Sequence, residues 1–136
     1  MDNFAEKSEV KPSKRMIMKA KKLFFKECHL AGRQYWDADE VWDELHVGTC
    51  LELKRDLENR HDMNAVAVVY HTIDEQTGET EEYMLGYIPR EENETIAQLL
   101  EMGWEDIFEC RICKLNPDAH YENQIRLTIK IKRNVK

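Results

Sequence analysis

Residues 51–70 of the chain are Leu-Glu-Leu-Lys-Arg-Asp-Leu-Glu-Asn-Arg-His-Asp-Met-Asn-Ala-Val-Ala-Val-Val-Tyr. Leu51 and Leu53 alternate with polar residues, as in a half-buried strand, and residues 66–69 form an apolar, largely β-branched run. Residues 55–64, which we call the central loop, are mostly polar. The stretch therefore predicts a strand, a structured loop and a second strand.

The central loop contains side chains of two kinds. Aspartate and asparagine side chains bond to nearby backbone and fix tight turns, and the loop has Asp56, Asn59, Asp62 and Asn64. The others, with no turn role, are Arg55, Arg60 and His61. A rigid loop with varied side chains suits a binding site, although the same pattern would serve a stiff connector between two strands.

Further elements are predicted on both sides of this stretch. Strands are expected in the second half of residues 19–32 and at 83–90, 107–115 and 124–133, with a polar hairpin tip at 74–82. Helices are expected at 37–45 and at 91–102, the second ending at Gly103. The fold class is thus mainly β (α+β): a small six-stranded antiparallel barrel or partly open sheet, with one or two short helices packed on it.

The 136 residues fit a single domain over residues 19–136 after a flexible basic tail at 1–18. The net charge is −7, but segments 11–26 and 126–136 contain basic residues and no acidic ones. If the two basic segments lie in neighbouring strands, they form one basic face that could follow a phosphate backbone; otherwise they are solvated tails. The sequence has no membrane-spanning apolar run and no signal-peptide core, so a cytoplasmic protein without membrane contact is expected.

Cysteines provide the main candidate for a metal site. Cys110 and Cys113 have the CxxC spacing, and Cys28 with His29 could complete a set of four ligands. However, residues three apart in an alternating strand point to opposite faces. We therefore expect the cysteines to be free thiols that pack as small core residues, with no metal and no other cofactor.

Catalytic motifs are absent from the sequence. It contains no phosphate-binding glycine loop, no nucleophile elbow and no His-Glu-x-x-His, and its histidines are scattered. No enzyme activity is expected.

Aromatic residues beside cations favour nucleic-acid binding, because single strands are held by stacking on rings and by cations along the backbone. The candidates are Tyr35 and Trp36 near Arg33, Tyr87 near Arg90, and His61 beside Arg60. Core packing is the alternative role for Trp36 and Tyr87. Asp62 would repel phosphate but accept a hydrogen bond from a hydroxyl group, so we hypothesise that it faces the 3′ hydroxyl end of a strand.

Three ordered blocks carry a family resemblance. They are Ala31-Gly32 with Tyr35-Trp36, the stretch 53–68, and Gly86–Arg90 with the helix that follows. Together they resemble the HIRAN domain family over about residues 22–115. The resemblance implies a small β-barrel related to oligonucleotide-binding and SH3-like barrels, with two helices. HIRAN domains occur attached to Swi/Snf-class ATPases that remodel stalled replication forks, and alone in bacteria and phages; this chain is similar to the stand-alone type.

The resemblance also implies roles for individual residues. By position, Tyr35 would stack on a base of single-stranded DNA, with Gln34 beside it. Asn59, His61 and Asp62 would surround the terminal nucleotide, with Asp62 on its 3′ hydroxyl. Any hydrolase activity found in the family would belong to an attached motor, since this sequence has no ATPase motif.

The chain departs from the family motif at two prolines of the central loop. Leu57 and Arg60 stand in their places. Because proline restricts the unfolded backbone, the loop is expected to be less rigid without it.

The sequence therefore predicts a non-catalytic module that binds single-stranded DNA, at its 3′ hydroxyl end, in DNA repair or replication-fork processing. The alternative is a protein-interaction module that docks a DNA-repair or phage-related partner through the same groove or through the acidic face. The predicted nucleic-acid contacts are Gln34, Tyr35, Trp36, Arg55, Asn59, Arg60, His61, Asp62, Tyr87 and Arg90.

Overall fold

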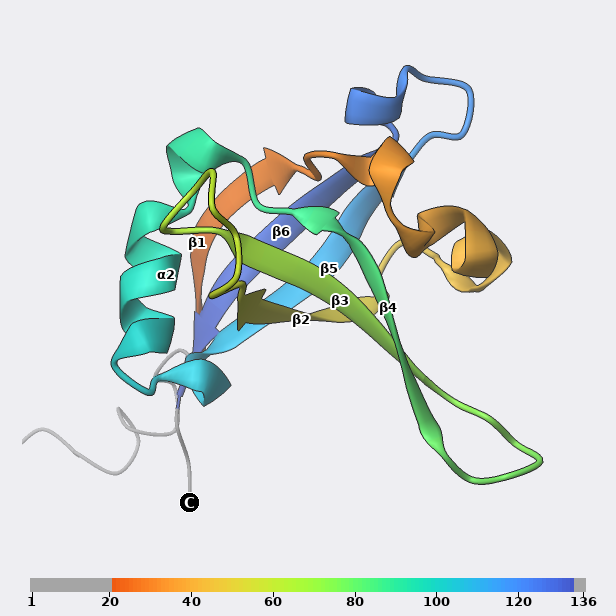
Figure 1. Cartoon of the computed structure of the whole chain (residues 1–136), viewed down its shortest axis with the longest axis horizontal. Coiled ribbons are helices and arrows are strands. Elements are labelled where there is room, and N and C mark those ends of the chain that lie inside the picture. The colour runs from red at the N-terminus through yellow and green to blue at the C-terminus, as the bar shows by residue number, and fades with distance from the viewer. Residues whose placement is uncertain (1–20, 134–136) are drawn as a thin grey trace, which may run out of the picture.

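The computed structural model describes residues 21–133, and the tail predicted at 1–18 lies outside them. Six strands form one antiparallel sheet in the order β1-β6-β5-β2-β3-β4 (Figure 1). Their bounds are β1 (Lys22–His29), β2 (Cys50–Arg55), β3 (Val66–Ile73), β4 (Thr80–Tyr87), β5 (Phe108–Leu115) and β6 (Ile125–Lys132). The predicted six-stranded, mainly β fold is confirmed.

The stretch that predicts the fold forms the middle of this sheet. β2 and β3 pair in antiparallel register, with Leu53 opposite Val68. Alternation along β2 buries Leu51 and Leu53, and the apolar run from Val66 to Val69 is buried throughout. The central loop joins the ends of these two strands, so the core on either side of the loop fixes where it begins and ends.

The sheet curls but does not close. Its ladder ends at β1 on one side and at β4 on the other. Within residues 21–133, these two edges meet at one isolated bridge between Ala31 and Tyr87, whose two backbone hydrogen bonds measure 2.8 and 2.9 Å. The 3-10 helices η2 (Arg33–Tyr35) and η3 (Asp37–Glu44) pack against β4, one of the two edge strands. Of the two predicted forms, the partly open sheet is therefore the one observed.

The hairpin between β3 and β4 extends further than predicted. Ladder pairs continue through His71–Glu82 and Thr72–Glu81 to Ile73–Thr80, so the tip covers residues 74–79 and not 74–82. The side chains here are largely solvated, and a strand without a buried face has no apolar alternation to reveal it.

Helices cover the ends of the curled sheet. α2 (Glu94–Glu101) is shorter than the predicted helix, because η4 (Arg90–Glu92) forms a separate 3-10 turn before it. α2 ends at the predicted glycine: Gly103 has a φ of 93°, and the N–H of Trp104 donates to the carbonyl of Leu99 at 3.0 Å. The buried side chains of α2 are Ile96, Ala97 and Leu100. The short helix predicted at 37–45 is present as the 3-10 helix η3.

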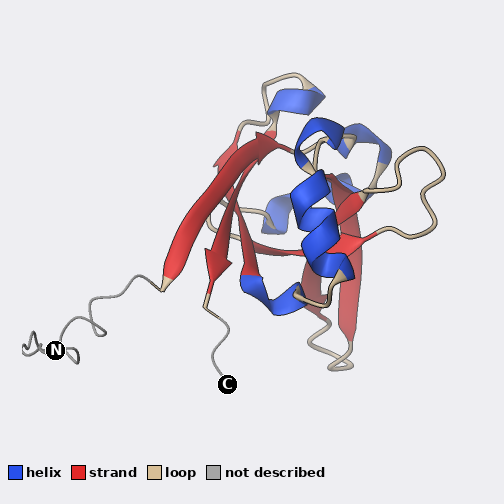
Figure 2. Ribbon diagram, turned by 90° about the vertical axis from the view of Figure 1, so that its left-hand side faces the viewer, coloured by secondary structure: helices blue, strands red, loops and turns tan. Residues whose placement is uncertain are grey.

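The two ends of the described chain lie in neighbouring strands. β1 pairs with β6, with Lys22 opposite Lys132, and Figure 2 shows these strands side by side where they lead to the terminal traces. The condition set for one basic face, that the two basic segments lie in neighbouring strands, is therefore met for their described parts. Within the described part of the chain, no helix has the length and apolar character needed to cross a membrane.

Candidate nucleic-acid interface

Side-chain oxygens fold the central loop into successive turns. Oδ1 of Asp56 accepts a hydrogen bond from the N–H of Glu58 (3.2 Å), and Oδ1 of Asp62 accepts one from the N–H of Asn64 (2.9 Å). Oδ1 of Asn59 accepts two, from the N–H groups of His61 (2.8 Å) and Asp62 (3.1 Å). The turn roles predicted for three of these residues are confirmed, whereas Asn64 takes part through its backbone. Asx turns therefore shape this loop, which lacks the family's prolines.

Two long-range hydrogen bonds hold the central loop against the rest of the molecule. The hydroxyl of Tyr87, the last residue of β4, donates to Oδ2 of Asp56 at 2.5 Å. The amide of Asn93, a buried residue just before α2, donates to Oδ2 of Asp62 at 2.8 Å. Burial and the neighbouring Asp56 carboxylate raise the pKa of Tyr87 to about 12. The phenol therefore stays protonated near neutral pH and remains a donor.

A pocket of about 660 Å³ opens beside the central loop. Its lining residues are Trp36, Asp56, Glu58, Asn59, Arg60, His61 and Tyr87. The rings of Trp36 and Tyr87 meet edge to face, with centroids 5.8 Å apart and planes at 75°. Trp36 remains 41% exposed, so its ring is open to a ligand as well as to Tyr87.

The pocket brings together five of the predicted contact residues, which are Trp36, Asn59, Arg60, His61 and Tyr87. They come from three places in the chain: the residue after η2, the central loop, and the end of β4. Gln34 and Tyr35 are exposed in η2 next to Trp36 but do not line the pocket, and Tyr35 is 77% exposed.

Arg90 and Asp62 support the central loop and do not line the pocket. The guanidinium of Arg90 donates to the carbonyl of His61, and its Nε lies 4.0 Å from Oδ2 of Asp62. Both carboxylate oxygens of Asp62 already accept hydrogen bonds from the protein. The geometry thus gives these two residues a structural role in shaping the loop.

Arg55 points away from the pocket and clamps α2 to the central loop. Its Nη1 donates to the carbonyl of Ala97 at 3.1 Å and to Glu101 Oε1 at 2.7 Å, and its Nη2 donates to the carbonyl of Met63 at 3.0 Å. Arg55 does not line the pocket. The sequence predicts Arg55 as a nucleic-acid contact, whereas in the structure its guanidinium bonds to α2 and to the carbonyl of Met63.

Two carboxylates of the pocket, Asp56 and Glu58, are missing from the predicted contacts. The pattern of the loop indicates a turn role for Asp56 and no role for Glu58. The pocket therefore combines three kinds of group: aromatic rings on which bases can stack, Arg60 for a phosphate, and carboxylates that accept hydrogen bonds from hydroxyl or amino groups.

The cysteines do not form the candidate metal set. All four are free; Cys28 and Cys110 are buried, Cys113 is partly buried and Cys50 is exposed. Burial raises the pKa of Cys28 to about 11 and raises that of Cys110 as well. Within residues 21–133, the group that brings three metal-ligating side chains together contains neither these cysteines nor His29.

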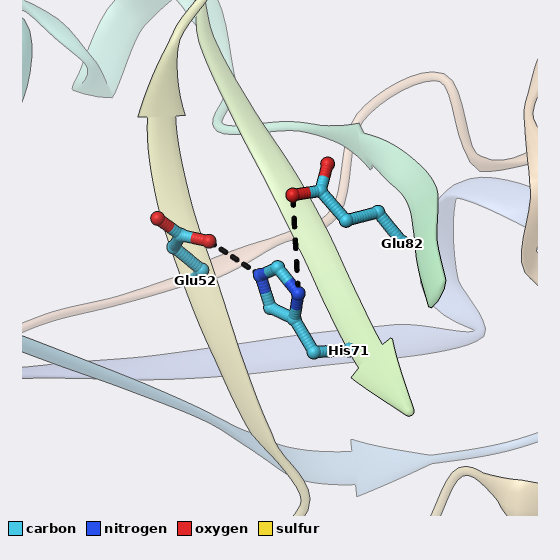
Figure 3. A group of neighbouring side chains, drawn as sticks. All are labelled: Glu52, His71 and Glu82. Atoms are coloured by element: carbon cyan, nitrogen blue, oxygen red, sulfur yellow. Dashed lines mark hydrogen bonds and ion pairs between the residues drawn. The ribbon is translucent and has the colours of Figure 1, made fainter. Parts of the chain in front are cut away.

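That group lies on an exposed face of β2, β3 and β4 (Figure 3). Glu52, His71 and Glu82 offer ligand atoms within 4.8 Å of one another. Glu52 approaches Nε2 of His71, whereas Glu82 lies 4.0 Å from Nδ1. The two carboxylates therefore contact different nitrogens of the ring. Lys54 also lies 3.3 Å from Glu82, and the group forms a cross-strand ionic network.

Comparisons with known proteins identify a solved structure of the same fold and a family whose model matches. Among curated proteins, none matches this chain. A solved structure of a Lactobacillus plantarum protein has a TM-score of 0.62 at 23% identity and covers 81% of this chain and 94% of its own. The HIRAN domain of human HLTF has a TM-score of 0.49 at 17% identity, covering 82% of this chain and 80% of its own. The family model of the HIRAN domain matches residues 23–132, which include all three sequence blocks, and the chain therefore belongs to the HIRAN domain family.

Proposed function

We propose that this chain is a non-catalytic module that binds single-stranded DNA, with a free 3′ end of the strand in the pocket beside the central loop. HIRAN domains are in general DNA-binding modules. The observation that carries the proposal is the pocket of about 660 Å³, where aromatic rings, Arg60 and carboxylates face one space. Stacking on such a ring contributes about 1–3 kcal/mol per base.

The carboxylates are the reason for proposing a strand end. Asp56 and Glu58 line the pocket, and carboxylates repel phosphates but accept short hydrogen bonds from hydroxyl groups. A terminal nucleotide with a free 3′ hydroxyl fits this mixture better than an internal nucleotide with phosphates on both sides. We assign the hydroxyl contact to Glu58 and not to Asp56 or Asp62, because both oxygens of each aspartate already accept hydrogen bonds from the protein.

A titration with three labelled oligonucleotides tests the proposal. The probes carry the same sequence as a single strand with a 3′ hydroxyl, as a single strand with a 3′ phosphate, and as a duplex. We expect the single strand with a 3′ hydroxyl to bind most tightly. In Glu58→Gln, the ratio of its affinity to that of the 3′ phosphate strand should decrease. Equal binding of all three probes would contradict the proposal.

The pocket is tested with a matched pair of tryptophan variants. Trp36 and Trp104 are similarly exposed, at 41% and 45%, but only Trp36 lines the pocket. Trp36→Ala should weaken binding of the 3′ hydroxyl strand about tenfold or more, as expected for one lost stacking platform. Trp104→Ala should leave binding unchanged. Equal losses in the two variants would argue against the pocket.

Exposed apolar side chains favour one second candidate, docking of a protein partner. Leu57 and Met63 of the central loop are 77% and 87% exposed. Salt dependence separates the two functions, because DNA affinity falls steeply with salt when phosphates are neutralised. Docking through Leu57 and Met63 would instead be insensitive to salt.

For the DNA-binding function we propose a cytoplasmic setting in DNA repair or replication-fork processing.

A further inference from the structure

A second surface with cations and an exposed ring lies on β1, β6 and β5, which are neighbours in the sheet (Figure 1). Along β6, Leu127 and Ile129 are buried, whereas Lys130 and Lys132 are exposed. The alternation of the strand therefore lines up its cations on the side facing away from the core. We call this side of the three strands the outer face.

An aromatic ring stands among these cations. Phe24 on β1 is 65% exposed and lies opposite Lys130 in the ladder, and Lys22 lies opposite Lys132. The phenyl ring makes no aromatic pair within the described part of the chain. An exposed ring flanked by lysines on two adjacent strands is the combination that holds single-stranded nucleic acid.

The outer face also contains a hollow of about 240 Å³, with Lys130, Arg111 and Thr128 among its lining residues. Lys130 is the ladder partner of Phe24. Thr128 lies opposite Arg111, and Lys130 opposite Glu109, in the ladder between β5 and β6. The hollow therefore continues the row of cations from β1 across to β5.

The acidic residue of this hollow is already neutralised. Glu109 lies 2.7 Å from Lys22 and 2.9 Å from Arg111. In residues 21–133, no carboxylate lies within 4.0 Å of Lys130 or Lys132. These two cations are therefore available to phosphates, although the chain as a whole carries a charge of −7.

We propose that the outer face is a second nucleic-acid contact, which takes the interior of a single strand. One base stacks on Phe24, while the adjoining phosphates lie on Lys130 and Lys132. A single strand is the occupant because its bases can leave the stack and reach an exposed ring, which the paired bases of a duplex cannot do. The inference goes beyond the pocket, which is proposed to take a strand end, because an open sheet face needs no end.

Strands without ends test this proposal separately from the pocket. The probes are a circular single-stranded oligonucleotide, its linear form with a 3′ hydroxyl, and a duplex closed by a loop at both ends. Phe24→Ala should weaken binding of the circle about tenfold. Lys130→Glu should weaken binding of the circle more than Phe24→Ala does. It should also lower the slope of log affinity against log salt by about 0.7 or more. Neither variant should change the preference of the linear strand for a 3′ hydroxyl over a 3′ phosphate.

A charge reversal elsewhere provides the matched control. Lys54→Glu changes the net charge by the same amount, but Lys54 lies on β2 beside Glu82, so binding of the circle should stay as in the original chain. Circular dichroism verifies that each variant is folded. Equal losses from Lys54→Glu and Lys130→Glu would overturn the proposal, as would duplex binding at least as tight as that of the circle. If only the linear strand binds, the proposal for the outer face is wrong and the proposal for the pocket is unaffected. If neither single strand binds, both proposals are wrong.

Discussion

The hydroxyl of Tyr87 donates a hydrogen bond of 2.5 Å to Oδ2 of Asp56, across 31 positions of sequence. Asp56 also holds the first turn of the central loop through its other oxygen. The ring of Tyr87 meets Trp36 edge to face. One tyrosine thus connects the end of β4, the start of the loop and the aromatic part of the pocket, so the pocket depends on this contact for its shape.

Tyr87→Phe should therefore loosen the central loop while keeping the ring. Loss of a hydrogen bond to a charged group lowers the free energy of unfolding by about 1.5–3 kcal/mol, which urea denaturation measures. DNA affinity should fall as well, because Asp56 is no longer held. Tyr83→Phe is the matched control, since within residues 21–133 the hydroxyl of Tyr83 bonds only to the exposed Glu81 on the same strand; stability and DNA binding of this variant should change little. Similar losses in both variants would refute the role given to Tyr87.

Gly86→Ala should destabilise the chain at the point where the two edges of the sheet meet. A Cβ at Gly86 would lie 2.5 Å from the carbonyl oxygen of Ala31, which bonds to the next residue, Tyr87. We expect a loss of about 2–3 kcal/mol in the free energy of unfolding, as for other overpacked sites. Gly78→Ala is the control, because nothing lies within 4 Å of its Cβ. Its positive φ should cost only about 1 kcal/mol.

The sequence predicts the sheet better than it predicts the site. Six strands follow from apolar alternation and β-branched runs, and the turns of the central loop follow from the short-range bonding of aspartate and asparagine. Both signals are local. The partner of Asp56 is Tyr87, 31 residues away, and no local pattern around Asp56 indicates that contact.

Arg55 shows why a residue next to a predicted site can belong elsewhere. It stands beside the turn residues in sequence, and a guanidinium there suits a phosphate contact. In the fold, its guanidinium instead bonds to the carbonyls of Ala97 and Met63. Glu58 is the opposite case, because the sequence predicts neither a turn role nor a contact for it, but its side chain lines the pocket. Side-chain direction depends on how the loop, β2 and α2 pack together, and this information is long-range.

Acid should weaken the contact between β1 and β5. Lys22 and Arg111 lower the pKa of Glu109 from 4.5 to about 2. A carboxyl group with a lowered pKa stabilises the folded state above its unfolded pKa, and this contribution disappears as the pH falls from 4.5 toward 2. Because Lys22 is 45% exposed, screening limits the contribution to about 1 kcal/mol. Urea unfolding of Glu109→Gln at pH 7 should show this loss, and the difference from the original chain should shrink by pH 3. Glu105→Gln, at an exposed position, is the control and should leave the free energy of unfolding at pH 7 nearly unchanged.

Arg55 and Arg60 should separate stability from binding, since both belong to the central loop but point to different neighbours. Arg55→Met removes two hydrogen bonds to backbone carbonyls and the ion pair with Glu101, so we expect the free energy of unfolding to fall by about 1–3 kcal/mol. Arg60 is exposed and lines the pocket, so Arg60→Met should leave stability nearly unchanged. It should weaken DNA binding and lower the salt slope by about 0.7, the value for one phosphate contact on a single strand. Urea denaturation and a salt titration of DNA affinity, done on both variants, provide the comparison. A stable Arg55→Met with a reduced salt slope would place Arg55 in the interface, because only a direct phosphate contact changes that slope without changing the fold.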